Sequence, residues 1–182
     1  MDEKYTQFND IPCFIEDGNW ECNFEINSVW DWINRHDKEY GSKLNLNPSF
    51  QRSHVWTQTQ QIEWLEFFLR GGKTGRVIYL NKPDWQAHRF YKKGTYNEFV
   101  VVDGKQRLEA CRRFLENEIK VFNSFYSEYT DKIRMMRASL RINVNTLQTE
   151  REVIQWYLQM NTGGTPHTQE EINKVKKLLE NK

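Results

Sequence analysis

The segment with the clearest chemical potential is DGKQR, residues 103–107, which follows an apolar run and opens a stretch of helical periodicity. A helix begins with unpaired backbone N–H groups and a partial positive charge, so a glycine at a strand-to-helix turn lets phosphate oxygens reach the backbone. Lys105 and Arg107 would add positive charge, and an arginine can bind phosphate through two parallel hydrogen bonds. Asp103 could hold a divalent cation whose other ligands are phosphate oxygens. The alternative is an ordinary Asp-Gly turn followed by a solvated basic turn of helix.

A second segment, NPSFQRSHVW at residues 47–56, places an aromatic residue and an arginine together on a proline-stiffened loop. Such a loop could present Arg52 to a ligand. The structural alternative is a packing loop, in which Phe50, Val55 and Trp56 enter the core and Arg52 lies at the surface.

A third segment, MNTGGTPHTQEE at residues 160–171, combines a glycine turn with a capping-box pattern. Thr168 is followed by Glu171 three positions later, the arrangement that satisfies the first N–H groups of a helix. This pattern favours a structural role. The P-loop and Rossmann fingerprints do not occur in the sequence, which excludes the usual nucleotide sites of those two kinds. The four histidines have no metal-like spacing, so we expect no dedicated zinc site.

The stretches between these segments predict helices interleaved with strands. A helix follows Ser28 as a plausible N-cap, and another begins after Thr57 and ends at the glycines 71–72. Further helices are expected at 149–160 and 168–180. RVIYLNKP predicts a short strand, EFVVVD a strand buried on both faces, and SLRINVNTL a half-buried strand whose polar residues should face outward: Arg141, Asn143 and Asn145. This alternation indicates an α+β or α/β fold.

Length and composition limit the class of protein. A chain of 182 residues suits one domain with decorated ends. The formal net charge of +1 gives little attraction to nucleic acid as a whole, so any such contact must come from a local patch. Three cysteines without metal-like spacing favour a reducing, cytoplasmic setting. No signal peptide or apolar run long enough to span a bilayer is found, so we expect no membrane association.

Taken in order, the three segments resemble one family. NPSFQRSHVW is similar to its Pro-x-[Tyr/Phe]-Gln-Arg-x-x-Val-Trp element, FVVVDGKQRLEACRRF to its strand-DGQQR-helix element, and MNTGGTPHTQEEI to its Asn-Thr-Gly-Gly-x-Pro element. These elements are those of the N-terminal domain of GmrSD-type modification-dependent restriction endonucleases, within the ParB/sulfiredoxin-like superfamily. The resemblance assigns residues 44–182 to a ParB-like nucleotide-binding domain and leaves residues 1–43 as an aromatic-rich extension with one helix.

The resemblance implies an α+β fold with a small mixed sheet flanked by helices. It also implies a nucleoside triphosphate with Mg²⁺, bound where the DGQQR loop faces the Gln-Arg loop, and hydrolysis that regulates DNA cleavage by a separate HNH-type domain. Lys105 departs from the family pattern, because it replaces the first glutamine. Carried over by position, the expected catalytic residues are Asp103, Gln106 and Arg107, the metal ligand is Asp103, and the nucleotide-binding residues are Gln51, Arg52, Gly104, Lys105, Gln106 and Arg107.

The expected function is therefore nucleoside-triphosphate binding and hydrolysis in a DNA restriction, anti-restriction or phage-related process. Expected partners are the nucleotide, and DNA or a nuclease or host defence protein. Autonomous nuclease activity is not expected, because the 182 residues contain no HNH module. Two alternatives remain open: an inactive DNA- or protein-binding module whose partner surface includes Trp20, Trp30 and Trp32, and a small phosphotransferase or DNA-nicking enzyme.

Overall fold

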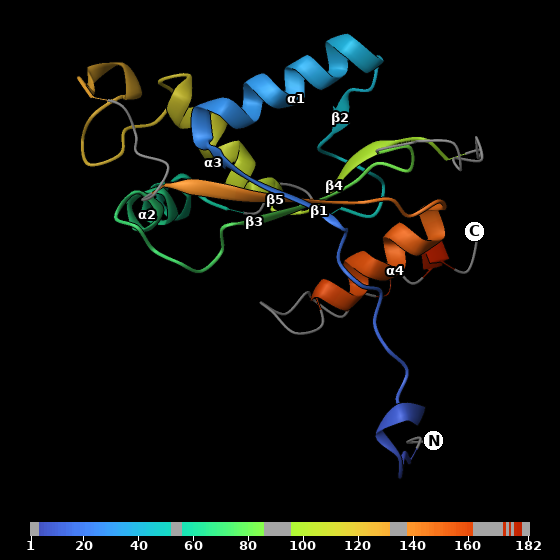
Figure 1. Ribbon diagram of the computed structural model, residues 1–182. Helices are drawn as coiled ribbons and strands as arrows, with labels where there is room; N and C mark the ends of the chain where they lie inside the picture. Colours follow the sequence, from blue (N-terminus) through green and yellow to red (C-terminus); the bar gives the residue numbers. More distant parts are fainter. Residues whose placement is uncertain are drawn as a thin grey trace.

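The structure is a computed structural model that describes residues 4–51, 56–85, 96–131, 138–161, 173, 175 and 177–179. Five strands form one sheet in the order β1-β5-β3-β4-β2 (Figure 1). The strands are β1 (Trp20–Glu25), β2 (Leu44–Asn45), β3 (Val77–Asn81), β4 (Phe99–Asp103) and β5 (Ser139–Asn145). The pairs β1–β5 and β3–β4 are antiparallel, whereas β3–β5 and β2–β4 are parallel. The sheet is therefore mixed, as expected for the α+β class.

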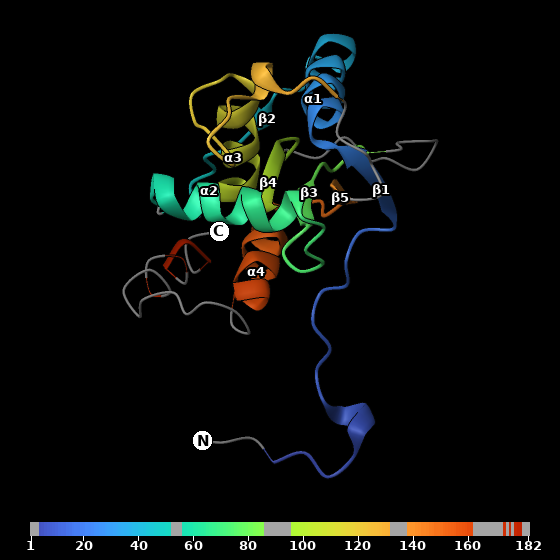
Figure 2. The same ribbon diagram turned by 90° about the vertical axis from the view of Figure 1, so that its left-hand side faces the viewer.

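Helices cover both faces of this sheet. On one face lie α1 (Ile26–Tyr40) and α3 (Lys105–Leu115), and α2 (Gln58–Leu69) lies at the end of the sheet; the buried side chains of all three share a single hydrophobic cluster with the strands. On the opposite face lies α4 (Glu150–Asn161), as Figures 1 and 2 show from two directions. The short 3-10 helix η1 (Phe8–Asp10) lies away from the sheet in both views, and a second one, η2 (Tyr126–Glu128), follows α3.

Strand β4 supplies both cores, as its apolar run predicted. Phe99 and Val101 enter the cluster beneath α1, α2 and α3, whereas Val100 and Val102 enter the cluster beneath α4. All four side chains are at most 1% exposed. Each buried aliphatic side chain contributes roughly 1.5–3 kcal/mol relative to an exposed one. The position of β4, and therefore of the turn that follows it, is fixed from both sides.

The polar side chains of β5 correct the sequence-based expectation. Arg141 is exposed as predicted, but Asn143 and Asn145 are only 3% and 9% exposed. The N-terminal segment 15–18 covers them. Asn143 exchanges two 2.9 Å hydrogen bonds with the backbone of Gly18, and the Asn145 amide donates to a backbone carbonyl of the same segment at 2.9 Å. These side-chain amides therefore attach the backbone of the N-terminal segment to β5.

The helix ends follow the expected signals in most cases. Thr57 caps α2 and forms a capping box with Gln60, as its position predicted. The expected N-cap at Ser28 is wrong, because α1 begins two residues earlier, at Ile26, whose side chain is fully buried. Helix α1 therefore starts without a capping side chain, and Ile26 and Val29 of its first turn are buried.

Three further elements, β1, α4 and the last predicted helix, lie toward the two ends of the chain. Strand β1 was not predicted, although it pairs with β5 along its whole length. The predicted 149–160 helix is α4, within one residue at each end. The last predicted helix is helical at its described residues, 173, 175 and 177–179, whereas the glycine turn and the Thr168–Glu171 capping box lie outside the described residues.

The tryptophans of the N-terminal region pack against the domain itself. Trp20 and Trp32 are stacked with ring centroids 5.6 Å apart, and both contact the Trp85 ring edge-on. His36 stacks on Trp85 at 4.8 Å, and burial there lowers the pKa of the His36 imidazole. Trp30 also packs partly buried against the main cluster. No helix among the described residues is long and apolar enough to span a bilayer.

Gly104 provides a test of the turn between β4 and α3. Its φ is +100°, and a Cβ atom there would lie 2.5 Å from Ile78 Cδ1. Gly41 has a φ of +61° but no neighbour within 4 Å of the same position. Gly41→Ala should cost about 1–2 kcal/mol through its left-handed backbone alone, a fall in Tm of about 2–8 °C. Gly104→Ala adds overlap with Ile78 and should cost about twice as much or more, as measured by thermal unfolding. Equal losses would mean that Ile78 moves aside freely.

Candidate functional site

The turn after β4 exposes the start of α3. Asp103 ends the strand, Gly104 is the N-cap, and Lys105 is the first helical residue. The N-cap has no side chain to cap the helix, and the first intrahelical bond runs from Leu108 N to Gly104 O at 3.0 Å. The N–H groups of the first turn therefore have no partner within the helix, which is the arrangement that favours an anion.

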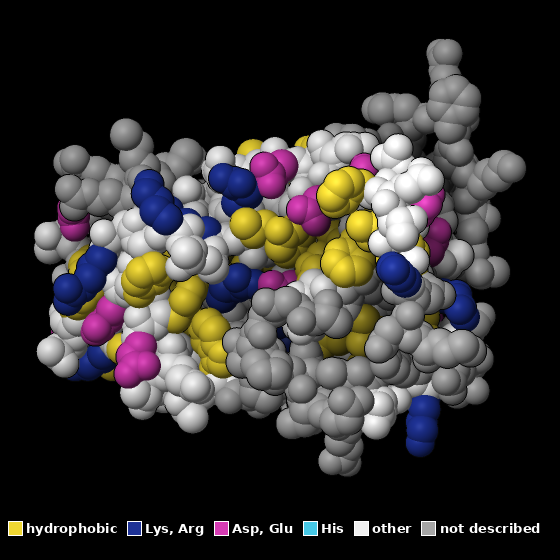
Figure 3. All heavy atoms as spheres, turned by 90° about the horizontal axis from the view of Figure 1, so that it is seen from below, with side chains coloured by type: hydrophobic (Ala, Val, Ile, Leu, Met, Phe, Trp, Pro, Cys, Tyr) yellow, Lys and Arg dark blue, Asp and Glu magenta, His cyan; other side chains and the backbone are white. Residues whose placement is uncertain are grey.

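A cavity of about 330 Å³ lies at this helix start. Its walls come from three parts of the chain that are far apart in sequence: the loop before α2, the β4–α3 turn and the end of α4. Figure 3 shows the molecule from the side on which α4 lies, where hydrophobic side chains and Lys or Arg side chains lie together at the surface. The lining residues are Gln51, Trp56, Asp103, Gly104, Lys105, Gln106, Arg107, Tyr157, Met160 and Asn161.

The cavity brings together the predicted site residues that the structure describes. Gln51 from the second segment lies with all five residues 103–107. Arg52, which we expected to bind the same nucleotide, lies outside the described residues. No pattern in the sequence predicted that Tyr157 lines this cavity, and the capping-box pattern favoured a structural role for the segment that begins at residue 160. The first two residues of that segment nevertheless line the cavity.

Two glutamines tie the loop before α2 to the turn. The Gln51 amide donates to the carbonyls of Val101 and Val102 at 3.2 and 2.7 Å, so the loop is attached to the end of β4. The Gln106 carbonyl oxygen accepts from the backbone N–H of Trp56 at 3.3 Å. These contacts hold Gln51 and Trp56, the two described ends of this loop, beside the β4–α3 turn. Asn161 is held in a similar way, because its amide donates to the Tyr157 carbonyl at 2.7 Å.

Arg107 and Asp103 form an ion pair across the first turn of α3. The Arg107 side chain is 15% exposed and the Asp103 side chain 42% exposed, so the pair lies at the mouth of the cavity. Because Arg107 is one turn along the helix from Asp103, its guanidinium points back toward the N-terminal end. This orientation places a forked donor next to the unpaired N–H groups.

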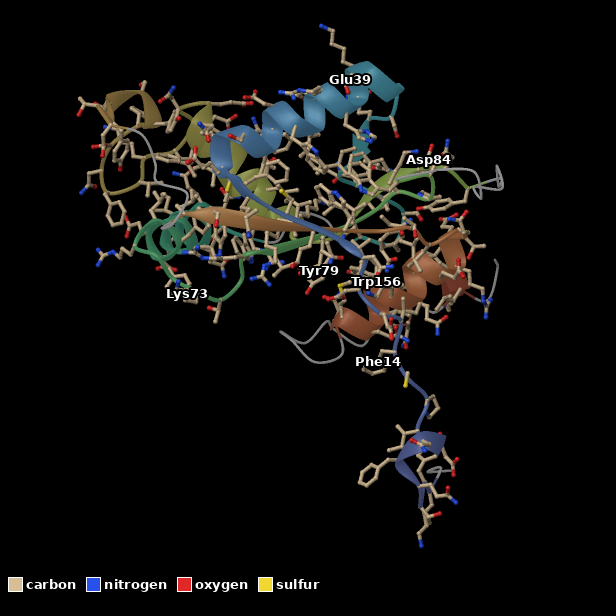
Figure 4. The ribbon with its side chains drawn as sticks, in the orientation of Figure 1. Phe14, Glu39, Lys73, Tyr79, Asp84 and Trp156 are labelled. Atoms are coloured by element: carbon tan, nitrogen blue, oxygen red, sulfur yellow. The ribbon has the colours of Figure 1, made fainter. Side chains whose placement is uncertain are left out.

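Tyr79 and Asp17 lie beside the ion pair of Asp103 and Arg107 and add two more polar side chains to this part of the sheet. Tyr79 is the cross-strand partner of Asp103 in the β3–β4 pairing and of Asn143 in the β3–β5 pairing. Its hydroxyl is hydrogen-bonded to the Asp17 carboxylate, and burial, with the charges of Asp17 and Asp103, raises the pKa of Tyr79. Figure 4 places Tyr79 and Trp156 on the side of the sheet on which α4 lies. The period-two pattern of β3 could have identified Tyr79 as a neighbour of the site; nothing in the sequence indicated Asp17.

The carboxylate in the cavity fits Mg²⁺ when the ion is bound together with phosphate. The described residues contain no group of three or more His, Cys, Asp or Glu side chains placed to hold a metal. Asp103 is the carboxylate that lines the cavity. Mg²⁺ in nucleotide sites is commonly held by one or two carboxylates together with phosphate oxygens and waters. Asp103 therefore fits the ion when the phosphates supply further ligands.

A known protein family matches most of the chain. A family described as "GmrSD restriction endonuclease, N-terminal domain" matches residues 29–178. The match includes the loop before α2, the β4–α3 turn and the end of α4, which together line the cavity. No curated protein and no solved structure matches the chain. The resemblance found from the three sequence segments is confirmed.

Lys105 allows a test of whether burial of its charge lowers the free energy of unfolding before any ligand binds. Burial lowers the pKa of the Lys105 ammonium below its usual value of 10.5. The folded state therefore holds this proton less well than the unfolded state, and the penalty is fully present at neutral pH and disappears as pH rises toward 10.5. Lys105→Met should raise Tm at pH 7, with a gain that shrinks toward pH 10.5. The exposed Lys43→Met should give no such pH-dependent gain; the same pH profile for both variants would contradict a buried charge.

Proposed function

The chain belongs to the family of the GmrSD restriction endonuclease N-terminal domain, and from this membership we propose that it binds a nucleoside triphosphate at the start of α3. The family makes it a component of restriction-type systems. The proposed ligand lies with its phosphates in the cavity beside Gly104 and Arg107. Nucleotide binding there regulates DNA cleavage, with DNA or a nuclease as the partner.

One observation carries this proposal: three segments far apart in sequence line one cavity that opens on an uncapped helix start. The cavity volume of about 330 Å³ is within the range of small-molecule sites. Lys105 and Arg107 provide two cations at the same end. A helix start, two cations and one carboxylate match the charges of a phosphate chain that carries a divalent ion.

The proposed roles follow from the position of each side chain. The N–H groups of the first turn of α3 and the Arg107 guanidinium bind phosphate oxygens, and Lys105 adds a single charge. Asp103 holds Mg²⁺, which when bound neutralises phosphate charge and draws electron density from the terminal phosphorus. Gln51 and the contact between Gln106 and Trp56 attach the two described ends of the loop before α2 to the β4–α3 turn.

Hydrolysis is the reaction that we propose for this site. A water molecule attacks the terminal phosphorus, the bond from that phosphorus to the bridging oxygen breaks, and the products are a nucleoside diphosphate, inorganic phosphate and a proton. Arg107 stabilises the charge on the transferred group, and the Gln106 side chain orients the water. Lys105 favours a second candidate, a nucleotide sensor that binds without turnover, because it replaces a glutamine of the family's DGQQR pattern.

Arg107→Ala tests phosphate binding. A charge-assisted hydrogen bond of this kind contributes about 1.5–3 kcal/mol, so the variant should bind a nucleoside triphosphate about 10- to 100-fold more weakly. Arg35→Ala, an exposed arginine on α1, is the matched control and should bind as the wild type does. Titration calorimetry at one fixed salt concentration measures both. Equal affinities would move phosphate recognition away from residues 103–107.

Asp103→Asn separates binding from turnover. The variant loses the charge that holds Mg²⁺ and should release no phosphate, while binding of the metal-free nucleotide persists. Asp31→Asn, on the exposed side of α1, is the control and should keep full turnover. The measurements are phosphate release with Mg²⁺ and calorimetry with a chelator. If the wild type binds nucleotide but releases no phosphate with any divalent metal, the sensor is the correct reading.

A further inference from the structure

An open groove of about 440 Å³ lies next to the phosphate cavity, between α2 and the turn before β3. Three aromatic side chains line it: Trp56, Trp64 and Phe67. Gln60 and Glu63, both exposed on α2, supply its polar edge. None of the three sequence segments predicted a site on α2.

The groove and the cavity are continuous. Trp56 lines both of them. Gly75, at the floor of the groove, lies where Arg107 reaches it: a Cβ atom on Gly75 would be 3.8 Å from Arg107 Nη1 and 3.5 Å from Trp64 Nε1. A ligand with its phosphates on Arg107 would therefore extend past Gly75 onto the aromatic side chains.

The aromatic side chains are held in place before any ligand arrives. Trp64 is stacked on Phe68, with ring centroids 5.1 Å apart and an interplanar angle of 16°. The Phe67 ring lies against Gly72, where an added Cβ would overlap it, yet the side chain is still 45% exposed. The Trp64 Nε1 atom is buried and has no hydrogen-bond partner among the described residues. Rigid, partly exposed rings are suited to stacking, because little conformational entropy is lost on binding.

The charges at the two ends give the ligand a direction. The cavity end carries Lys105, Arg107 and the start of α3, whereas the groove end carries the Glu63 carboxylate. A carboxylate repels phosphate and accepts hydrogen bonds from N–H groups. The anionic part of a ligand therefore belongs in the cavity, and an uncharged aromatic part with N–H donors belongs in the groove.

We infer that the groove holds the nucleobase of the nucleotide whose phosphates bind at α3, stacked on the aromatic side chains with its polar edge toward Glu63. This inference rests on the proposed function. Stacking is tolerant of base identity, whereas the edge contact is not. Trp56, Trp64 and Phe67 therefore contribute affinity for any base, and Glu63 determines which base is preferred. Figure 3 shows hydrophobic side chains at the surface on the side of the molecule where α2 lies.

The test compares each of the four nucleoside triphosphates with inorganic tripolyphosphate, both with Mg²⁺, by titration calorimetry. The wild type should bind at least one nucleotide more tightly than tripolyphosphate. Phe67→Ala should weaken nucleotide binding about tenfold or more and leave tripolyphosphate binding unchanged. Phe8→Ala, whose side chain is 92% exposed, is the matched control and should change neither. Glu63→Gln should change the order of preference among the four nucleotides, because an amide can donate as well as accept.

The outcomes distinguish the inference from the proposed function. If the wild type binds tripolyphosphate and every nucleotide equally well, and Phe67→Ala changes neither, the base site is wrong and the phosphate site stands. If neither ligand binds, both are wrong. If Phe67→Ala weakens binding of a single-stranded oligonucleotide while nucleotide binding is unaffected, the groove binds nucleic acid and the inference is overturned. If Phe67→Ala lowers the Tm, the result for Glu63→Gln decides the question, because this substitution keeps the size of an exposed side chain. An unchanged order of preference among the four nucleotides would then contradict the base site.

Discussion

The contact between Gly104 and Ile78 determines the geometry on which the site depends. Strand β4 is buried on both faces, so it cannot shift, and the chain must turn into α3 in the space that Ile78 leaves. Only a residue without a side chain fits there at a φ of +100°. One consequence is an uncapped helix start at the end of a fixed strand. The other is that Asp103 and Arg107, four positions apart, meet on the same side of the turn.

The rest of the site is attached to this turn by hydrogen bonds and not by apolar packing. Gln51 reaches two carbonyls at the end of β4, and Gln106 accepts from the loop that carries Trp56. A similar arrangement occurs on β5, two strands from the turn, where the Asn143 amide is hydrogen-bonded to Gly18 of the N-terminal segment, next to Asp17, the hydrogen-bond partner of Tyr79. Amide side chains thus join segments distant in sequence to the edges of a rigid sheet, a role that fits their capacity to donate and accept at once.

Local signals were sufficient for the elements that carry the turn. The apolar run of β4, the glycine break and the N-cap at Thr57 each depend on neighbours within a few residues, and each is confirmed. Strand β1 and the burial of Asn143 depend on pairing between segments more than 100 positions apart, which no local pattern reports. The aromatic groove also depends on a contact between separate segments. In the sequence Trp64 has the pattern of a half-buried helix residue, and only the fold brings Gly75 next to it.

The ion pair between Asp103 and Arg107 raises a physical question about the proposed ligand, because both groups already have a partner. A phosphate that took Arg107 alone would leave the carboxylate next to a new anion, and a cation that took Asp103 alone would leave it next to the guanidinium. Phosphate and Mg²⁺ arriving together avoid both repulsions, since each charge exchanges one partner for another. If the proposed function is correct, the ion pair makes binding of a lone phosphate or a lone cation less favourable than binding of their complex. In the proposed site, selectivity for a metal-bound nucleotide therefore comes from two sources: the ion pair that is present before binding, and the contacts that the nucleotide makes once it is bound.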